Sequence, residues 1–583
     1  MRMTSVMLKV PSVATIIVLA LGAADPPAFD ADSLPSLLRA SEYRQVLPEL
    51  PVAAGATLVK AAHFLLSDTG IENNPLRDEN GEKVPPYVYH AVIDDDGHFS
   101  YRAAYPSFHH AYLIEAFLNY YDYSGETDAI RRARDLADWN IRHSTPPGWR
   151  WPNLPWSTFT EGKPGGSVDK ETLEPDKTAY LGLAYTRLYE ITGDAKYLEA
   201  ARRIAETLTL RQQDDGAWPF RVNPESGEVI QAYTAALFMP VAFLEKMYAL
   251  TGNPNYKNAQ MAGWMWMLRN PIRTNNWSGL YEDIPKGNDS QVHYAPSQTI
   301  RLLLRYRTEV NGESYLAHAH RLFDYTMDGL AFDDREMGLV FREQTTYLAA
   351  TPSSAMNWSM MSAEFFLATG EPRYRATVLH ALRAVTRYGL KPDGRTHNTL
   401  LGARIYGDGG SWYSLTSPVV RYLYQDMGCL PELAPARETH LLRTSTQIRR
   451  ISYLAGAVEY TSLPDSIDLL KLGRDPADVK VGGRSAAASP DLRGASPLIC
   501  AGHSGHIVRT SSNHFSSFSR NFRDRAYVVL PNWLTKPNSP NSGTRSCPFA
   551  VKQRYDNHRN RSKAAGDDER ALAACRSAGT GWA

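Results

Sequence analysis

The chain has 583 residues, with 63 Lys and Arg against 62 Asp and Glu. This near-balance argues against the basic excess that nucleic-acid binding requires, so no nucleic-acid partner is expected. Hydrophobic residues at 43% exclude whole-chain disorder, and four cysteines are too few for a disulfide scaffold of this size. The average hides an asymmetry, because the last 100 residues hold 15 Lys and Arg against 6 Asp and Glu, whereas the rest hold 48 against 56.

The N-terminus has the layout of a secretory signal peptide over residues 1–24. Arg2 and Lys9 precede a mostly apolar run, residues 10–21, and the small residues 22–24 offer a cleavage site. The run is shorter than the ~20 residues that a membrane helix needs. We therefore expect a secreted or periplasmic protein with no membrane span after cleavage; a buried N-terminal helix is the alternative.

A repeat with a period near 60 residues follows. Each copy has an aromatic-rich helix, a Gly-centred turn, and a second helix rich in Ala and Arg. The copies are residues 120–139, 189–208, 248–268, 306–327 and 366–389, and their turn glycines are Gly125, Gly193, Gly252, Gly312 and Gly370. Gly at a helix C-terminus tolerates the positive φ that this position requires. In residues 195–211 the apolar positions form one stripe, whereas residues 180–191 are apolar on more sides, as an inner helix should be.

Two half-repeats flank these copies. Residues 54–66 resemble an outer helix without its partner, and residues 412–427 resemble an inner helix without its partner. Pairing the two halves closes a ring of six helical hairpins. We therefore predict an all-α (α/α)6 toroid over residues 25–435, and an open solenoid is the alternative.

The connections between hairpins are long and should emerge on one face of the ring. They are residues 67–106, 144–175, 212–231, 270–292, 329–353 and 390–410. Long loops gathered on one rim indicate a binding face. They carry aromatic residues suited to sugar faces, with polar residues suited to hydroxyls. The aromatic candidates for substrate contacts are Trp149, Trp151, Trp218, Trp277, Tyr281 and Trp412. The alternative is that each Trp packs its loop onto the helices.

The hairpin repeat, the long rim loops and the Asp-Gly-aromatic segments together resemble the six-hairpin glycosidase and toroidal polysaccharide lyase superfamily. The resemblance spans about residues 50–430 and concerns the architecture, without a motif for one family. It implies an enzyme acting on a polysaccharide or oligosaccharide.

Our main prediction is a polysaccharide lyase that cleaves a uronate-containing glycan by β-elimination. A lyase must neutralise the C5 carboxylate, remove the C5 proton and protonate the leaving oxygen. The catalytic candidates, at inner-helix starts and on the rim, are His109, His293, Tyr294, Asn357 and Arg342. Two further rim arginines, Arg221 and Arg404, are candidates for binding the substrate carboxylate. Capping or core hydrogen bonding is the alternative role for the His and Tyr residues.

The alternative reaction is glycoside hydrolysis, which needs two carboxyl groups beside the glycosidic bond. The favoured acids are Asp215, Glu282 and Asp283. Further carboxylates expected on the same rim are Asp94, Asp95, Asp96, Glu161 and Asp176.

Two other classes stay open. Residues 212–218 match one copy of the Q-x-x-D-G-x-W motif that terpene cyclases repeat, and a non-catalytic glycan-binding protein is the remaining choice. No HExxH or CxxC motif indicates a metal, so we expect no cofactor; structural Ca²⁺ on the acidic loops is left open.

The helical repeat pattern ends at about residue 427. Residues 436–483 alternate like strands and predict a small β-rich appendage. Residues 484–583 are rich in Ser, Arg, Asn and Pro without a sustained period, and we expect a disordered or non-native tail.

Overall fold

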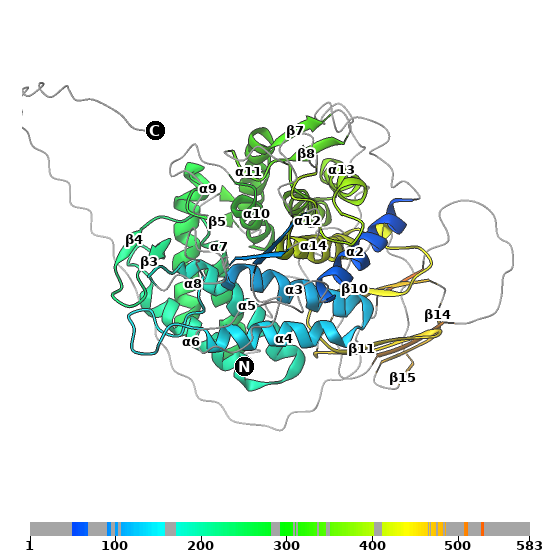
Figure 1. Cartoon of the computed structure of the whole chain (residues 1–583), viewed down its shortest axis with the longest axis horizontal. Coiled ribbons are helices and arrows are strands. Elements are labelled where there is room, and N and C mark those ends of the chain that lie inside the picture. The colour runs from blue at the N-terminus through cyan, green and yellow to red at the C-terminus, as the bar shows by residue number, and fades with distance from the viewer. Residues whose placement is uncertain are drawn as a thin grey trace, which may run out of the picture. The chain divides into compact units, whose positions relative to one another are not determined.

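A ring of helical hairpins dominates the computed structural model of the chain (Figure 1). The structure describes residues 49–67, 90–94, 99–102, 106–157, 171–280, 292–306, 309–310, 313–334, 337–345, 350–400, 411–464, 466, 468–473, 476–481, 484–485, 506–510 and 526–529. The predicted signal peptide lies outside these residues. The chain divides into two units, Met1–Leu534 and Thr535–Ala583, and every described residue lies in the first.

Six inner helices form a closed ring, each packing against the next and the last against the first. They are α3 (Pro106–Ser124), α5 (Pro175–Thr192), α7 (Phe238–Thr251), α10 (Tyr294–Tyr306), α12 (Pro352–Thr369) and α14 (Ser417–Cys429). The outer helices are α2 (Leu50–Leu66), α4 (Thr127–Arg142), α6 (Ala195–Arg211), α8 (Pro254–Arg269), α11 (Tyr315–Leu330) and α13 (Pro372–Tyr388). Because α14 packs against both α2 and α3, the two half-repeats join. The predicted (α/α)6 toroid is confirmed, and the open solenoid is excluded.

The hairpin turns follow the predicted chemistry. Gly125, Gly193, Gly252 and Gly370 all have φ between 70° and 77°, in the left-handed region that glycine tolerates. Gly312 lies outside the described residues; beside it are two short paired strands, β5 (Glu309–Val310) and β6 (Glu313–Ser314). Burial also follows the pattern, since α6 buries one stripe and α5 is buried on nearly all sides.

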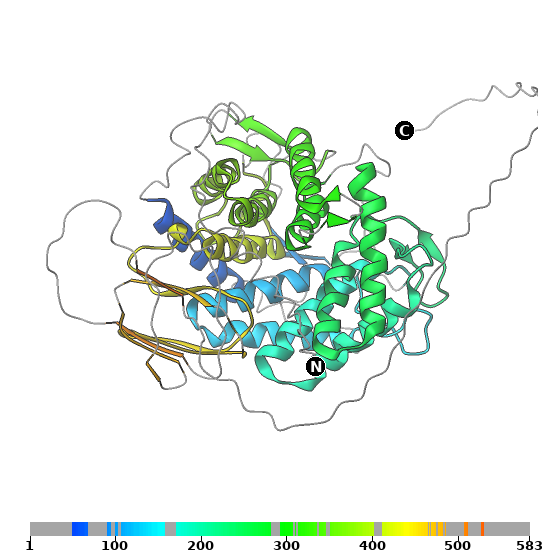
Figure 2. The same ribbon diagram turned by 180° about the vertical axis from the view of Figure 1, so that it is seen from behind.

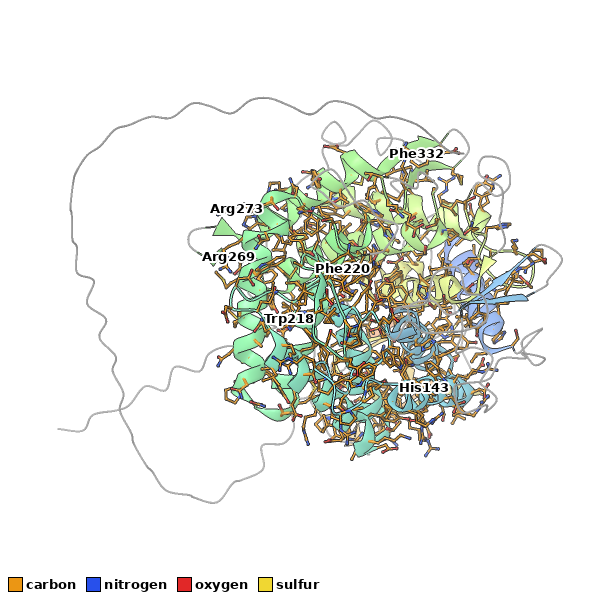
Figure 3. All side chains as sticks on the ribbon, turned by 60° about the vertical axis from the view of Figure 1, so that its left-hand side comes forward. His143, Trp218, Phe220, Arg269, Arg273 and Phe332 are labelled. Atoms are coloured by element: carbon orange, nitrogen blue, oxygen red, sulfur yellow. The ribbon has the colours of Figure 1, made fainter. Side chains whose placement is uncertain are left out.

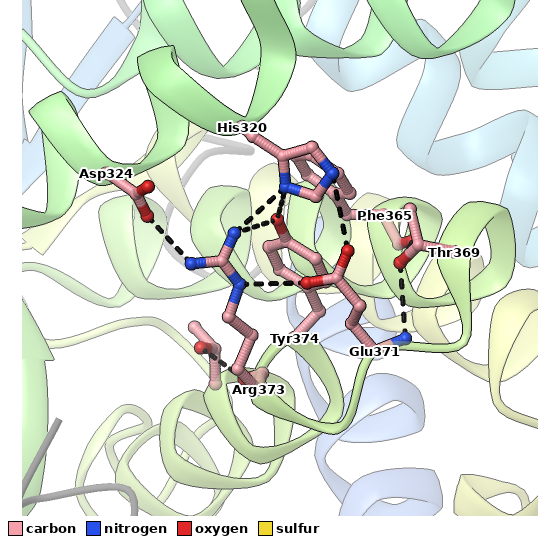
Figure 4. Close-up of polar contacts among 8 residues, drawn as sticks. His320, Asp324, Phe365, Thr369, Glu371, Arg373 and Tyr374 are labelled. Carbon is pink, nitrogen blue, oxygen red and sulfur yellow. Dashed lines mark hydrogen bonds and ion pairs between the residues drawn. The ribbon is translucent and has the colours of Figure 1, made fainter. Parts of the chain in front are cut away.

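Polar clusters tie neighbouring hairpins together on the outside of the ring. Between α11 and α13, the His320 Nδ1 atom lies 2.7 Å from the Tyr374 hydroxyl, and Arg373 donates to Asp324 at 2.9 Å (Figure 4). The Tyr374 ring stacks on Phe365 at 3.9 Å. These contacts join two neighbouring hairpins, α10–α11 and α12–α13.

A strand-rich part follows α14 and a short 3-10 turn, η7 (Pro431–Leu433). Its strands are β10 (His440–Thr444), β11 (Ile448–Leu454), β12 (Ala457–Ser462), β13 (Asp468–Leu472), β14 (Pro476–Val481), β15 (Arg484–Ser485), β16 (His506–Thr510) and β17 (Ala526–Val529). They form antiparallel sheets in the orders β10-β13-β17 and β11-β12-β16-β14-β15. Figure 2 shows the strands of this part in yellow and orange. The last three strands, β15, β16 and β17, lie in the segment that the sequence predicts as disordered. That prediction is corrected for them, because pairing with earlier strands supplies hydrogen bonds that a local pattern does not reveal.

The strand-rich part docks on the hairpin-turn end of the ring. The Tyr453 hydroxyl donates to the carbonyl of Asp122 at 2.6 Å, and the amide of Ile451 donates to the Tyr121 hydroxyl at 3.1 Å. Both acceptors are near the C-terminus of α3. The opposite end, where the inner helices begin, is left to the long loops. None of the described helices combines the length and hydrophobicity needed to cross a membrane.

Candidate functional site

The inter-hairpin loops form a collar around the starts of the inner helices. Their short elements are β1 (His90–Ile93), β2 (Phe99–Arg102), β3 (Arg221–Val222), β4 (Val229–Gln231), α9 (Pro271–Thr274), β7 (Ala331–Asp334), β8 (Gly338–Phe341), β9 (Ser411–Trp412) and the 3-10 turn η6 (Tyr413–Thr416). Backbone hydrogen bonds join the second to sixth loops in sequence: Leu173 with Val222, Ala235 with Ser278, Val292 with Gln344, and Ala350 with Leu400. Pairing of β1 with β9 joins the first loop to the last. The predicted gathering of the loops at one end is therefore observed.

Aromatic and charged side chains from four inner helices meet beneath this collar. The Phe108 ring lies 5.5 Å from that of Tyr294 and 5.9 Å from that of Tyr180. Arg421, on α14, lies 5.2 Å from the Tyr180 ring and pairs with Glu115. Since these residues come from α3, α5, α10 and α14, the centre of the ring is a packed floor of aromatic and charged groups.

A cluster of buried charges stands one helical turn above that floor, at the start of α5. The Lys177 Nζ atom lies 2.9 Å from Asp176 Oδ2 and 3.4 Å from Glu174 Oε2. Arg221 Nε lies 3.0 Å from Glu174 Oε1. Asp176 precedes Tyr180 by four residues, so it lies on the face of α5 that points to the floor. Lys177 also contacts the Phe220 ring, at 5.3 Å from its centroid.

Asp176 is the most unusual carboxyl group of this cluster. Its side chain is completely buried, and its Oδ1 atom has no hydrogen-bond partner among the described residues. Burial, together with the negative charge of Glu174, raises the pKa of Asp176 to about 6, although Lys177 opposes the shift. A carboxyl group with a pKa raised in this way is suited to donate a proton near neutral pH.

The residues predicted as lyase catalysts are partly brought together at the start of α10. Asn357 Nδ2 lies 3.0 Å from His293 Nδ1, and the His293 ring neighbours that of Tyr294. Burial lowers the pKa of His293 to about 3, so this imidazole is neutral in the fold. His109 follows Phe108 on α3 and is buried. All four residues therefore lie at inner-helix starts, as predicted.

The two described rim arginines differ in their partners. The Arg221 guanidinium is held by Glu174 and by the Phe220 ring, 4.9 Å away. The Arg342 guanidinium packs on Phe332 at 4.8 Å, and its buried Nε atom has no hydrogen-bond partner among the described residues. Arg342 therefore places a positive charge in the loop before α12, with one donor that the described residues leave unused.

Most of the tryptophans predicted to contact substrate are buried, and this prediction is corrected for Trp151, Trp218 and Trp277. Trp218 is fully buried and donates from Nε1 to the carbonyl of Leu208 at 2.8 Å. Figure 3 places Trp218 and Phe220 among the packed helices. Burying an indole stabilises a long loop more than exposing it does, so the packing alternative holds for these three. Trp149 stays partly exposed.

The favoured hydrolase acid Asp215 has a structural role. Its Oδ1 accepts from the amide of Ala217 at 2.9 Å, and its Oδ2 accepts from Trp266 Nε1 at 3.2 Å. Both oxygens are thus used to hold the loop on α8, and the prediction of Asp215 as a catalytic acid is corrected. Trp412 belongs to strand β9, paired with Val92, instead of starting an inner helix.

Several predicted site residues lie outside the described part of the chain. They are Tyr281, Glu282, Asp283 and Arg404, together with the further rim carboxylates Asp95, Asp96 and Glu161. Within the described residues, no group of three or more His, Cys, Asp or Glu side chains could hold a metal ion.

Asp176 is among the carboxylates that the sequence predicts on the rim, whereas its neighbours Glu174 and Lys177 are not among the predicted site residues. The segment Glu174-Pro175-Asp176-Lys177 opens an inner helix with three charges, in a stretch otherwise as apolar as a core helix. Charged residues at the start of a helix buried on all sides are costly unless paired, and that conflict was the available signal.

Comparison with known families supports a carbohydrate-active protein. Residues 88–282 match the family model described as Glycosyl Hydrolase Family 88, and this segment includes α3–α8 and the Asp176 cluster. The chain is thus similar to six-hairpin glycosidases, as the hairpin repeat suggested. The match favours the alternative prediction, glycoside hydrolysis, and the main prediction of β-elimination finds no support. No match is found among curated proteins.

Solved structures with a related course of the chain include three with carbohydrate substrates in their names. An unsaturated glucuronyl hydrolase specific for heparin has 11% identity and a TM-score of 0.46, and 66% of this chain covers 99% of it. A cellobiose 2-epimerase from Spirochaeta thermophila DSM 6192 has 12% identity and a TM-score of 0.49. The match covers 68% of this chain and 100% of the epimerase. An unsaturated glucuronyl hydrolase from Streptococcus agalactiae has 12% identity and a TM-score of 0.44, with 69% and 97% covered.

Proposed function

We propose that the protein is a glycoside hydrolase acting on a uronate-containing oligosaccharide or polysaccharide, with Asp176 as its general acid. The observation that carries the proposal is the buried carboxyl group of Asp176, with a raised pKa and an unpartnered oxygen, inside the segment that matches a glycosyl hydrolase family. The loop collar above it has the position expected for a glycan site.

In the proposed reaction Asp176 donates its proton to the glycosidic oxygen as the bond from that oxygen to the anomeric carbon breaks. A water molecule forms the new bond to the anomeric carbon, and a carboxylate takes up the proton that the water loses. Glu174 is our candidate for that carboxylate, because it is the second acid of the buried cluster and is held in place by Lys177 and Arg221. Lys177 and Arg221 balance the charge of the pair.

The uronate preference rests on the cations of the site. Arg342 has no acid partner among the described residues, and Arg221 faces the Glu174 carboxylate next to the site. A guanidinium group can bind a sugar carboxylate with two hydrogen bonds. Neutral glycans would leave the Arg342 charge without a partner.

A panel of uronate-containing oligosaccharides, some with an unsaturated uronate at the non-reducing end, tests the reaction. We expect new reducing ends without new ultraviolet absorbance from an unsaturated product. Absorbance that grows with cleavage would identify a lyase instead. Cleavage of neutral glycans at the same rate would remove the uronate preference.

The role of Asp176 is tested by Asp176→Asn, with Asp214→Asn as the matched control on an exposed loop position. Removing a general acid should lower kcat by about 10²–10⁴-fold. We also expect kcat/KM of the wild type to fall as the pH rises through about 6, where Asp176 loses its proton. Full activity of a folded Asp176→Asn protein would refute the assignment.

We further propose export, based on the N-terminal pattern alone. Expression of the full chain with its first 24 residues should give a secreted product that lacks them. N-terminal sequencing of the secreted protein checks this, and a product retained in the cell with residue 1 intact would contradict it.

A further inference from the structure

A network of side-chain hydrogen bonds runs between the inner helices α10 and α12 and ends at His293. Arg301 on α10 forms a bidentate pair with Glu364 on α12, at 2.8 and 2.6 Å. Arg301 also donates to Gln298 Oε1 at 2.8 Å. Gln298 Nε2 donates to Asn357 Oδ1 at 2.9 Å, and Asn357 Nδ2 contacts His293 Nδ1 at 3.0 Å.

Donors and acceptors in this hydrogen-bond network can be assigned in only one way. A guanidinium group can only donate, so the Gln298 atom beside Arg301 must be its oxygen. The Gln298 amide nitrogen then faces Asn357, whose nearest atom must be its oxygen, and the Asn357 nitrogen faces His293. The Nδ1 atom of His293 is therefore an acceptor, and in a neutral imidazole the proton sits on Nε2.

Ser297 supports the same direction independently. Its hydroxyl donates to the backbone carbonyl of Tyr294 at 2.8 Å, so its oxygen must accept the second hydrogen of Asn357 Nδ2, at 2.5 Å. Asn357 and Ser297 are both almost completely buried, where an incorrectly oriented amide would leave donors facing donors. Two separate contacts thus orient the Asn357 amide.

We infer that Glu364, Arg301, Gln298 and Asn357 hold His293 as a neutral Nε2–H tautomer, so that His293 serves the proposed hydrolase as a hydrogen-bond donor to a substrate oxygen. No described residue accepts a hydrogen bond from Nε2, although His293 stands at the start of α10 beside Tyr294. The donor role rests on the proposed function; the tautomer does not. In this role His293 binds substrate, and the other four are positioning residues.

The tautomer of His293 decides between two roles, catalytic base and hydrogen-bond donor, that the residue type alone leaves open. An Nε2 atom that carries a proton cannot abstract one, so His293 in this tautomer is no base for a β-elimination. It can instead stabilise negative charge on a sugar hydroxyl, ring or carboxylate oxygen.

The isosteric substitution Gln298→Glu tests this assignment of donors and acceptors in the hydrogen-bond network. The carboxylate keeps its pair with Arg301 but turns an acceptor toward Asn357, so the Asn357 amide must rotate and present its oxygen to His293. His293 would then carry its proton on Nδ1. Gln260→Glu is the matched control, because Gln260 is equally buried, accepts from Lys257 and donates to Tyr306, away from the site.

The first readout is the ¹⁵N spectrum of protein labelled on histidine, without substrate. The His293 signals, identified by their loss in His293→Gln, should show a protonated Nε2 in the wild type and in Gln260→Glu, and a protonated Nδ1 in Gln298→Glu. A wild type with a protonated Nδ1, or an unchanged tautomer in Gln298→Glu, would overturn the inference. If Gln298→Glu does not fold, Asn357→Asp makes the same reversal and replaces it.

The second readout is kcat/KM on a cleaved uronate oligosaccharide. Gln298→Glu should lower it by about 10- to 100-fold, the size expected for one lost hydrogen bond to substrate, and Gln260→Glu should not. His293→Gln keeps a donor near the Nε2 position and should retain more activity than His293→Phe. Equal activity of these two variants would overturn the donor role, while the tautomer would still be decided by the spectrum. If no glycan is cleaved at all, the proposed function fails. The ¹⁵N spectrum then still tests whether the hydrogen-bond network fixes the tautomer of His293.

Discussion

Two lysine–aspartate pairs, one at the start of the inner helix α5 and one between the outer helices α4 and α6, have the same nitrogen–oxygen distance. At the start of α5, Lys177 and Asp176 are 2.9 Å apart with both side chains fully buried. Between the outer helices, Lys196 and Asp138 are also 2.9 Å apart, but their side chains are 41% and 29% exposed. In the buried pair, burial raises the pKa of Asp176 to about 6 even though Lys177 opposes the shift. The comparison shows that burial, more than pairing distance, sets the chemistry of a carboxyl group.

The largest effect is expected from removing the lysine of each pair. Lys177→Met leaves Asp176 and Glu174 without their shared cation and should lower the free energy of unfolding by about 3–5 kcal/mol. Lys196→Met removes an exposed pair and should change it by less than about 1 kcal/mol. Urea unfolding measures both, and equal losses would break the comparison.

Lys177→Met should also shift the activity profile. Lys177 lowers the pKa of Asp176 against the effect of burial, so its removal should move the fall in kcat/KM to a higher pH. An unchanged profile in the folded variant would show that Asp176 is not the group that titrates.

A buried carboxyl group at the turn end gives an intermediate effect. Burial raises the pKa of Asp122 from 3.8 to about 7, against Arg187, whose guanidinium lies 3.7 Å away. Because the folded state holds a proton that the unfolded state has lost, stability should decrease as the pH rises from about 4 to about 7, by about 2–4 kcal/mol. Asp122→Asn should lack this decrease, and Asp128→Asn, at an exposed position, should keep it. Thermal unfolding across this pH range checks the sign; a wild type that gains stability relative to Asp122→Asn would contradict it.

The smallest effect is expected from Trp218→Phe, which tests whether the buried tryptophans of the loop end take part in binding. The variant loses the hydrogen bond to Leu208 and part of the packed ring, so stability should fall by about 1–2 kcal/mol. KM for a cleaved oligosaccharide should stay unchanged, because the indole packs against Gly263 on α8 and uses its Nε1 hydrogen on the Leu208 carbonyl of α6. A several-fold rise in KM with unchanged stability would restore Trp218 as a substrate contact.

The sequence predicted the ring because its evidence is local and repeated. The glycine turns at Gly125, Gly193, Gly252 and Gly370 end their helices where the positive φ requires it. The apolar stripe of α6 and the all-round burial of α5 follow from spacing alone. Helix starts are less well defined, because Pro418 fits the first turn of α14 and moves its start to Ser417, five residues after Trp412.

The roles of single residues in the loops could not be predicted in this way. The sequence around a loop Trp is the same whether its side chain faces a sugar or the core. Only tertiary packing decided that Trp218 and Trp277 are buried. Asp215 and Asp176 are both rim carboxylates in the sequence. The structure gives one of them two structural hydrogen bonds and leaves the other with an unpartnered oxygen.

The sequence by itself thus determined the hairpins, their number and the end of the ring that carries the loops, because backbone conformation and hydrophobic periodicity are encoded within a few turns of chain. The tertiary structure alone decided which carboxyl group is buried beside a lysine and which nitrogen of His293 carries the proton. Desolvation and hydrogen-bond direction depend on neighbours that are up to 64 positions away in the chain, as Asn357 is from His293.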